Sequence, residues 1–186
     1  MLKIVEGLNG AGKSTVIKRW IDKGLGELVP IPLPIFANNV RWNEVKRPFQ
    51  RYKATQIKGN QDRVSLYNFA VFETILFYVA TKFERGYSKE LYLDRSFLSG
   101  LVYNSINIKT FDLLIDYYQG ILGDKLEFVY LDTDIEMCIE RRRKTKGKEY
   151  AILDPEEQYR LDMKYKNTFK YYENIKFTLS KEGEEE

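Results

Sequence analysis

Short apolar runs alternate with amphipathic stretches along this chain, a pattern typical of a parallel β-sheet whose faces are covered by helices. Candidate strands lie at 2–5, 91–93, 126–131 and 175–179. Apolar spacing and capping residues predict helices at 13–22, 62–85, 96–106, 111–118, 134–143 and 154–171. The alternation indicates an α/β fold, in which ligands bind beyond the carboxyl ends of the strands.

A fifth strand is harder to place, because prolines interrupt its apolar run. The segment 28–36 carries Pro30, Pro32 and Pro34. Proline has no N–H to donate to a β-ladder, and it restricts the residue before it. We therefore expect only a short strand in this segment, followed by an extended loop.

The composition suits one folded domain spanning residues 1–186. The chain has 186 residues, of which 44% are hydrophobic, and its 14 Tyr, 11 Phe and 2 Trp exclude wholesale disorder. The charged stretch at 181–186 is expected to form a flexible tail.

The charge balance points to a small ligand more than to a membrane or a nucleic acid. Thirty Lys and Arg against 27 Asp and Glu leave a formal charge of +3, which suits a small anionic ligand. No apolar run approaches the ~20 residues that a membrane helix needs, and the start is charged too soon for a signal peptide. We expect a cytoplasmic protein without a membrane partner.

Two missing residue types narrow the chemistry. The chain has no histidine, which excludes imidazole metal ligands and imidazole acid–base catalysis. Its single cysteine, Cys138, excludes an intramolecular disulfide and a multi-cysteine zinc site, and we expect it to be buried packing. Chemistry must therefore run on carboxylates, Lys, Arg, hydroxyls and backbone amides.

A phosphate-binding motif follows the first predicted strand. Every fixed position of G-x-x-x-x-G-K-[ST] is matched by Gly7-Leu8-Asn9-Gly10-Ala11-Gly12-Lys13-Ser14-Thr15. Because the motif leaves a strand and opens a helix, a chance glycine-rich turn is the weaker interpretation. We expect Lys13 to bridge the β- and γ-phosphates of ATP and Ser14 to bind Mg²⁺. The predicted ATP-binding residues are Gly7, Asn9, Gly10, Ala11, Gly12, Lys13, Ser14 and Thr15.

Asp94 and Arg95 stand where the strand at 91–93 ends. The carboxyl ends of parallel strands share one edge of the sheet, so both side chains should lie near the phosphate motif. Asp94 could hold Mg²⁺ directly or through water, and Arg95 could reach the transferring phosphoryl group. The alternative is a helix-capping Asp beside a surface Arg; the nearby phosphate motif favours the functional interpretation.

Three segments resemble thymidylate kinases and deoxynucleoside kinases. The stretch 6–15 looks like the opening of both families, and 94–104 resembles the thymidylate kinase run D-R-Y-x-x-S-x-x-A-Y-Q. The stretch 131–143 resembles the strand and helix that lead into the lid of both families. The resemblance implies a three-layer P-loop nucleotide-kinase fold with a five-stranded parallel sheet, helices on both faces and a short basic lid at about 141–152. It also implies ATP as donor and Mg²⁺ as metal.

The resemblance assigns further roles. In the basic run that begins at Arg141, the lid cation would be Arg143, with Arg141 as an alternative ATP contact. Two residues apart, these arginines cannot share a helix face. Tyr103 would crowd the ribose 2′ position and Asn104 would face the acceptor base. Phe69, on the long helix, would stack on that base, although most aromatic residues at helical spacing are core.

Three departures from the thymidylate kinase pattern leave the acceptor base open. The family stretch R-E-P-G-G is absent after the second strand. The acidic P-loop residue that contacts the acceptor sugar is Asn9 here. Glu73 lies about where an arginine would contact thymine, and its carboxylate could accept from an amino base.

The nature of the acceptor separates two kinases. A nucleoside hydroxyl must lose a proton and benefits from a carboxylate base, whereas a monophosphate needs cations. No carboxylate lies in 28–39, and Arg41 and Arg47 follow it. We therefore expect phosphorylation of a deoxynucleoside monophosphate, dTMP first, to its diphosphate. A deoxynucleoside kinase with Asp94 as base is the alternative.

Other functions remain as rivals. A GTPase is disfavoured because neither N-K-x-D nor D-x-x-G is present. The basic run at 141–148 motivates a nucleic-acid-binding or polynucleotide kinase protein, and a P-loop protein can bind nucleotide without catalysis. The expected partners are small nucleotides rather than nucleic acid, and a homodimer is left open.

Overall fold

The structure is a computed structural model that describes residues 1–30, 61–103, 106–146, 154–172 and 176–180. Side chains at the start of the long helix, at 61–64 and 66–67, and at 145–146 are not described. The predicted site residues Arg41, Arg47 and Asn104, and the lid beyond residue 146, lie outside the described residues.

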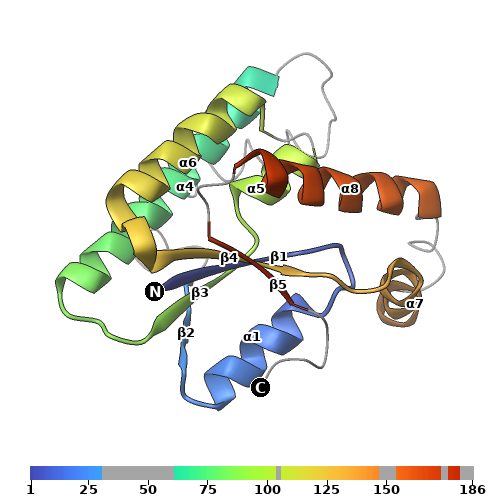
Figure 1. Ribbon diagram of the computed structural model, residues 1–186, viewed down its shortest axis with the longest axis horizontal. Coiled ribbons are helices and arrows are strands. Elements are labelled where there is room, and N and C mark those ends of the chain that lie inside the picture. Colours follow the sequence, from blue (N-terminus) through green and yellow to red (C-terminus); the bar gives the residue numbers. More distant parts are fainter. Residues whose placement is uncertain (31–60, 104–105, 147–153, 173–175, 181–186) are drawn as a thin grey trace.

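Five parallel strands form one sheet in the order β2-β3-β1-β4-β5 (Figure 1). Their bounds are β1 Leu2–Glu6, β2 Gly26–Leu28, β3 Glu90–Asp94, β4 Leu126–Leu131 and β5 Phe177–Ser180. Every residue of β4 is buried, as are four of the five in β1. Strands covered on both faces read as continuous apolar runs, which is why these two were clear in the sequence.

Helices cover both faces of this sheet. They are α1 Lys13–Asp22, α4 Gln61–Glu84, α5 Phe97–Val102, α6 Ile108–Leu122, α7 Ile135–Lys146 and α8 Pro155–Tyr171, with a short 3₁₀ turn at Gly123–Lys125. Figure 1 shows α4, α5, α6 and α8 on one side and α1 on the other. The predicted three-layer α/β fold with a five-stranded parallel sheet is confirmed. No helix in the described part of the chain is long and apolar enough to cross a membrane.

The second strand differs from its prediction. It lies at Gly26–Leu28, so it shares only Leu28 with the apolar segment 28–36 and ends before the three prolines. Gly26 permits this placement, because a Cβ there would clash with the Glu90 carbonyl of β3. The ladder needs a close backbone approach and free N–H groups, so the strand forms where these exist rather than where the apolar run is longest.

Capping residues set the ends of several helices. Ser96 caps α5 by accepting from the Leu98 N–H at 3.1 Å, but α5 ends at Val102, short of the predicted 106. Asn107 then caps α6 by accepting from the Thr110 N–H at 2.9 Å, so α6 is longer than the predicted 111–118. The cap at Asn107 therefore starts a new helix inside the stretch 96–118, at a position that apolar spacing alone did not predict.

The core packs mainly between the sheet and the α4, α5, α6 and α8 side. The Phe97 ring, at the start of α5, lies 4.9–6.0 Å from the rings of Phe72, Phe111, Tyr118 and Phe128. Cys138 is buried, as predicted. Because Phe97 follows the carboxyl end of β3 by three residues, this aromatic packing holds the β3–α5 turn, which carries Asp94 and Arg95.

Candidate active site

The loop between β1 and α1 has the backbone of an anion cradle. Gly7, Gly10 and Gly12 adopt φ values of 147°, 93° and 89°, which glycine accepts readily and other residues do not. Gly12 is the N-cap of α1, and no side chain caps that helix. The N–H groups of its first turn therefore face an anion site with the positive end of the helix dipole behind them.

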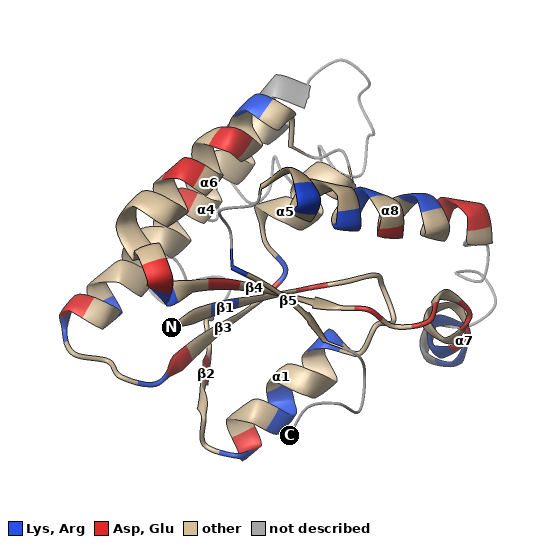
Figure 2. Ribbon diagram, in the orientation of Figure 1, with Lys and Arg blue, Asp and Glu red and all other residues tan. Residues whose placement is uncertain are grey.

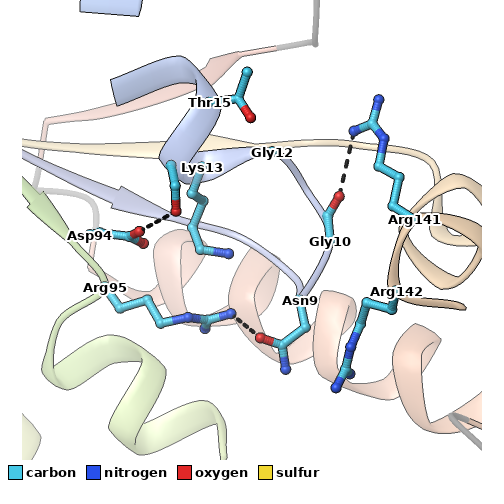
Figure 3. Close-up of a pocket in the computed structure, with 10 residues that line it drawn as sticks. Asn9, Gly10, Gly12, Lys13, Thr15, Asp94, Arg95, Arg141 and Arg142 are labelled. Carbon is cyan, nitrogen blue, oxygen red and sulfur yellow. Dashed lines mark hydrogen bonds between the residues drawn. The ribbon is translucent and has the colours of Figure 1, made fainter. Parts of the chain in front are cut away.

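Helix α7 is fastened directly to this loop. A Cβ on Gly10 would clash with the backbone carbonyl of Cys138, so α7 lies in van der Waals contact with the loop. The Thr133 hydroxyl donates to the Ala11 carbonyl at 3.0 Å, and Arg141 Nη1 donates to the Gly10 carbonyl at 3.5 Å (Figure 3). The conformation of the loop thus depends on a segment more than 120 residues away in the sequence.

Lys13 is buried within the loop. Its Nζ donates to the carbonyls of Leu8 at 2.8 Å and Gly7 at 3.2 Å. Burial, followed by the positive charge of Arg95, lowers the pKa of Lys13 to about 8, against the opposing pull of nearby carboxylates. An ammonium held by two neutral carbonyls lacks a full counter-charge, which a phosphate oxygen in the cradle would supply.

Ser14 and Asp94 meet at the mouth of the cradle. The Ser14 hydroxyl donates to Asp94 Oδ2 at 2.8 Å (Figure 3). The parallel register that pairs Val5 with Asp94 places the end of β3 beside the loop. A hydroxyl and a carboxylate are oxygen donors of the kind that Mg²⁺ prefers. No cluster of three or more carboxylate or thiol ligands occurs among the described residues.

Arg95 is held in an unusual backbone conformation. Its φ of 72° is the one positive value found for a residue other than glycine in the described segments. The guanidinium donates from Nη2 to Asn9 Oδ1 at 2.6 Å and from Nη1 to the hydroxyls of Ser99 at 2.9 Å and Tyr165 at 3.3 Å. Left-handed backbone at a non-glycine residue persists where the surrounding structure over-determines it, and the side chain of Arg95 is held by three acceptors.

Glu6 lies at the site, although no sequence motif predicted a role for it. This last residue of β1 is fully buried, and its carboxylate accepts from the Ser96 N–H at 2.8 Å, the Ser96 hydroxyl at 2.6 Å and the Ser99 hydroxyl at 2.5 Å. Burial raises the pKa of Glu6, and the serine hydrogen bonds and the charge of Arg95 oppose that rise. A carboxylate ending an apolar strand was the signal that could have identified it.

These elements surround a cavity of about 700 Å³. Its lining comprises Asn9, Gly10, Gly12, Lys13, Ser14, Thr15, Asp94, Arg95, Arg141 and Arg142. All but Arg142 are predicted site residues, drawn from the loop, the end of β3 and α7 (Figure 3). Among the described residues, four cations and one carboxylate line this cavity, which suits an anion carrying several negative charges.

The structure does not place Arg143 at this cavity. Basic residues gather on α7 (Figure 2), where Arg141 and Arg142 line the cavity and Arg143 is exposed. Successive helical residues are rotated by about 100°, so the two arginines nearest the loop along α7 face it and the third turns away. The choice of Arg143 as the lid cation stays a prediction; the arginines of α7 that line the cavity are Arg141, the predicted alternative, and Arg142.

Two predicted acceptor residues lie in the described part of the chain. The Tyr103 ring is partly buried, with the Arg95 guanidinium carbon 5.4 Å from its centre and the Tyr165 ring edge-on at 6.4 Å. Phe69 is partly buried against the core, with its ring edge-on to Tyr117 at 5.9 Å. Tyr103 therefore borders Arg95, whereas the described contacts of Phe69 are packing contacts.

The fold has known counterparts, although the sequence matches no protein-family model and no curated protein. The YorR protein of Bacillus subtilis, solved in complex with phosphorylated GDP, is 15% identical with a TM-score of 0.58, covering 99% of this chain and 87% of that one. Deoxyadenosine kinase from M. mycoides, solved with bound dATP, is 19% identical with a TM-score of 0.51, covering 97% and 91%. At these identities the similarity establishes a shared fold.

Proposed function

We propose that this protein transfers the γ-phosphoryl group of ATP, in the presence of Mg²⁺, to a deoxynucleoside monophosphate. The observation that carries the proposal is the composition of the cavity. Lys13, Arg95, Arg141 and Arg142 line it, and the one carboxylate among its described lining residues, Asp94, accepts a hydrogen bond from Ser14. Such a cavity suits a reaction in which both substrates bring phosphate charge.

The residues of the donor side fit ATP and Mg²⁺. The glycine-rich loop and the start of α1 would hold the β- and γ-phosphates, with Lys13 as the buried cation between them. Ser14 and Asp94 would hold Mg²⁺, which supplies charge neutralisation at the phosphate oxygens when bound. Arg95, and Arg141 or Arg142 from α7, would stabilise the negative charge that spreads over the transferring group.

The acceptor side favours an anionic acceptor. A nucleoside hydroxyl needs a carboxylate near it to take its proton. Among the described residues that line the cavity only Asp94 is a carboxylate, and Glu6 is fully buried with three donors already bound. A monophosphate carries a charge of about −2 near neutral pH and needs no base. The predicted contacts Arg41 and Arg47 would add cations for it.

The finer specificity rests on the resemblance of residues 94–104 to thymidylate kinases. It makes dTMP the first candidate, with Tyr103 excluding a ribose 2′-hydroxyl and Asn104 at the base. Phe69 would stack on that base. Glu73, in place of an arginine, favours a base with an amino group, so dCMP and dAMP are the candidates to compare with dTMP.

A deoxynucleoside acceptor is the second candidate. Two observations favour it: the chain shares its fold, over nearly its full length, with a deoxyadenosine kinase that was solved with dATP, and Asp94 borders the cavity. If Ser14 released Asp94, that carboxylate could accept the proton of a 5′-hydroxyl.

A panel of acceptors tests the proposal. Purified protein, ATP and Mg²⁺ are incubated with each of the four deoxynucleosides, their monophosphates, and a DNA oligonucleotide with a 5′-hydroxyl, and the products are separated by chromatography. We expect diphosphate from at least one monophosphate, and none with Lys13→Met. A far higher kcat/KM for a nucleoside would transfer the assignment to the second candidate. Phosphorylation of the oligonucleotide alone, or no transfer to any acceptor, would refute both.

A further inference from the structure

We propose that Glu6 is a positioning residue for Arg95, which it orients through the hydroxyl of Ser99 before any nucleotide binds. The proposal rests on the proposed function, because it assigns a role within the same site. Glu6 cannot touch a substrate, since it is fully buried. It accepts from Ser99 at 2.5 Å, and Ser99 accepts from Arg95 Nη1 at 2.9 Å.

The hydrogen count sets the direction of these bonds. A serine hydroxyl has one hydrogen and two lone pairs. Because the Ser99 hydroxyl donates to Glu6, it must accept from Arg95 and from the Tyr165 hydroxyl, which lies 2.8 Å away. The Glu6 carboxylate is thus the terminal acceptor of a chain that begins at the guanidinium. Without it, the Ser99 hydrogen could turn toward Arg95 and oppose the guanidinium.

Three separate elements converge on the guanidinium through these contacts. Ser99 lies on α5, Tyr165 on α8 and Asn9 in the phosphate loop, and each accepts a hydrogen bond from Arg95. The three bonds engage at most three of the five N–H donors of an arginine, and both Nη atoms take part in them. An arginine held in this way loses little freedom when a substrate binds, which is the condition for effective stabilisation of a transition state.

A matched pair of variants separates positioning from simple stabilisation. Ser96 and Ser99 each donate a hydroxyl to Glu6, but only Ser99 contacts Arg95. Both Ser96→Ala and Ser99→Ala remove one donor from the buried carboxylate, so both should lower the melting temperature. We expect Ser99→Ala alone to lower kcat, by about tenfold or more, with the KM for ATP nearly unchanged.

A double-mutant cycle tests whether the effect passes through Arg95. In an Arg95→Lys background the guanidinium is absent, so adding Ser99→Ala should lower kcat no further. If Ser99→Ala does not fold, Tyr165→Phe removes the neighbouring hydroxyl without touching Glu6 and should act in the same direction. Equal losses of kcat in Ser96→Ala and Ser99→Ala, or an undiminished effect in the Arg95→Lys background, would overturn the proposal.

A measurement without turnover separates this proposal from the proposed function. In ¹⁵N NMR spectra of the free protein, a guanidinium held at both Nη atoms should give resolved Nη signals, assigned to Arg95 by their loss in Arg95→Lys. Ser99→Ala should average these signals and Ser96→Ala should keep them. An inactive wild type with this NMR result would refute the kinase while supporting the positioning role; signals unaffected by Ser99→Ala would refute positioning whatever the activity.

Discussion

The Ser14 hydroxyl lies 2.8 Å from Asp94 Oδ2, joining the first turn of α1 to the end of β3 across 80 residues of sequence. The bond sits beside the phosphate loop, where the two oxygens would share one Mg²⁺ with the phosphates of ATP. It also occupies the one carboxylate among the described residues that line the cavity. The pair thus supports both the metal position and the preference for an acceptor that needs no base.

Asp94→Asn should lower kcat/KM by about 10- to 100-fold, because an amide binds Mg²⁺ more weakly than a carboxylate. Raising the Mg²⁺ concentration should restore part of the activity. The measurement is a Mg²⁺ titration of turnover for the wild type and the variant. Unchanged activity over the whole titration would return Asp94 to a structural role at the end of β3.

Lys13→Met should abolish transfer and leave the fold at least as stable as the wild type at pH 7. Lowering the lysine pKa from 10.5 to about 8 corresponds to about 3 kcal/mol against the charged form in the folded protein. Thermal unfolding at several pH values checks this. The penalty is fully present below pH 8 and is relieved as pH rises from about 8 toward 10.5, so any stability advantage of the variant should shrink there. Wild-type turnover in the variant would remove Lys13 from the mechanism.

Nucleotide binding should weaken as Lys13 loses its proton. With a pKa of about 8, roughly nine-tenths of the protein carries the charged lysine at pH 7 and one-tenth at pH 9. We expect the Kd of ATP to rise about tenfold between these values, with proton uptake on binding at pH 9. Calorimetry in two buffers of different ionisation enthalpy measures both quantities. Lys13→Met is the control, and its Kd for ATP should not rise in this way between pH 7 and pH 9. An equal rise in the variant would mean that another group titrates.

Gly10→Ala should destabilise the protein and weaken ATP binding together. The residue has φ 93°, and its Cβ would meet the Cys138 carbonyl, so the loop and α7 would have to separate. We expect a loss of about 2 kcal/mol or more in unfolding free energy. Gly120→Ala is the matched control, because it lies in α6 with open space around it and should stabilise by about 0.5–1 kcal/mol. An equal response of the two variants would contradict the clash.

Arg142→Ala should reduce kcat/KM for ATP by about tenfold or more, whereas Arg143→Ala should stay near the wild type. Arg142 lines the phosphate cavity and Arg143 is exposed on another side of α7. Removing a charge-assisted hydrogen bond to phosphate accounts for the expected size. Steady-state kinetics with ATP as the varied substrate decides between them. A larger loss of kcat/KM in Arg143→Ala than in Arg142→Ala would favour Arg143 as the lid cation.

The local sequence pattern was enough to predict the elements whose structure depends mainly on residues close together in the sequence. The prediction of β4 at 126–131 agrees with the structure, because a strand buried on both faces is apolar throughout. Helix α8 begins at Pro155 behind its Asp154 cap and ends at Tyr171, as predicted. The phosphate loop was equally clear, since its glycine spacing is itself the requirement of the backbone.

Local pattern misplaced features that depend on contacts between distant segments. The short strand β2 lies at Gly26–Leu28, where the backbone of β3 approaches closely, whereas the prediction placed it in the proline-containing run that begins at Leu28. Arg142 was missed because the facing side of α7 is set by its packing on Gly10. Neither can be derived from spacing along a single element.

The residues of the site can be named from the amino-acid sequence: a phosphate loop, a carboxylate and an arginine at a strand end, and no histidine or second cysteine. Which of these groups meet depends on the folded chain, since Arg95 bonds to Asn9 and Glu6 to Ser99 across 86 and 93 residues. The parallel register brings the carboxyl ends of β1 and β3 to one edge, and the packing around that edge buries Lys13 and Glu6. That burial lowers the pKa of Lys13 and raises that of Glu6, because the cost of burying a charge depends on everything packed around it.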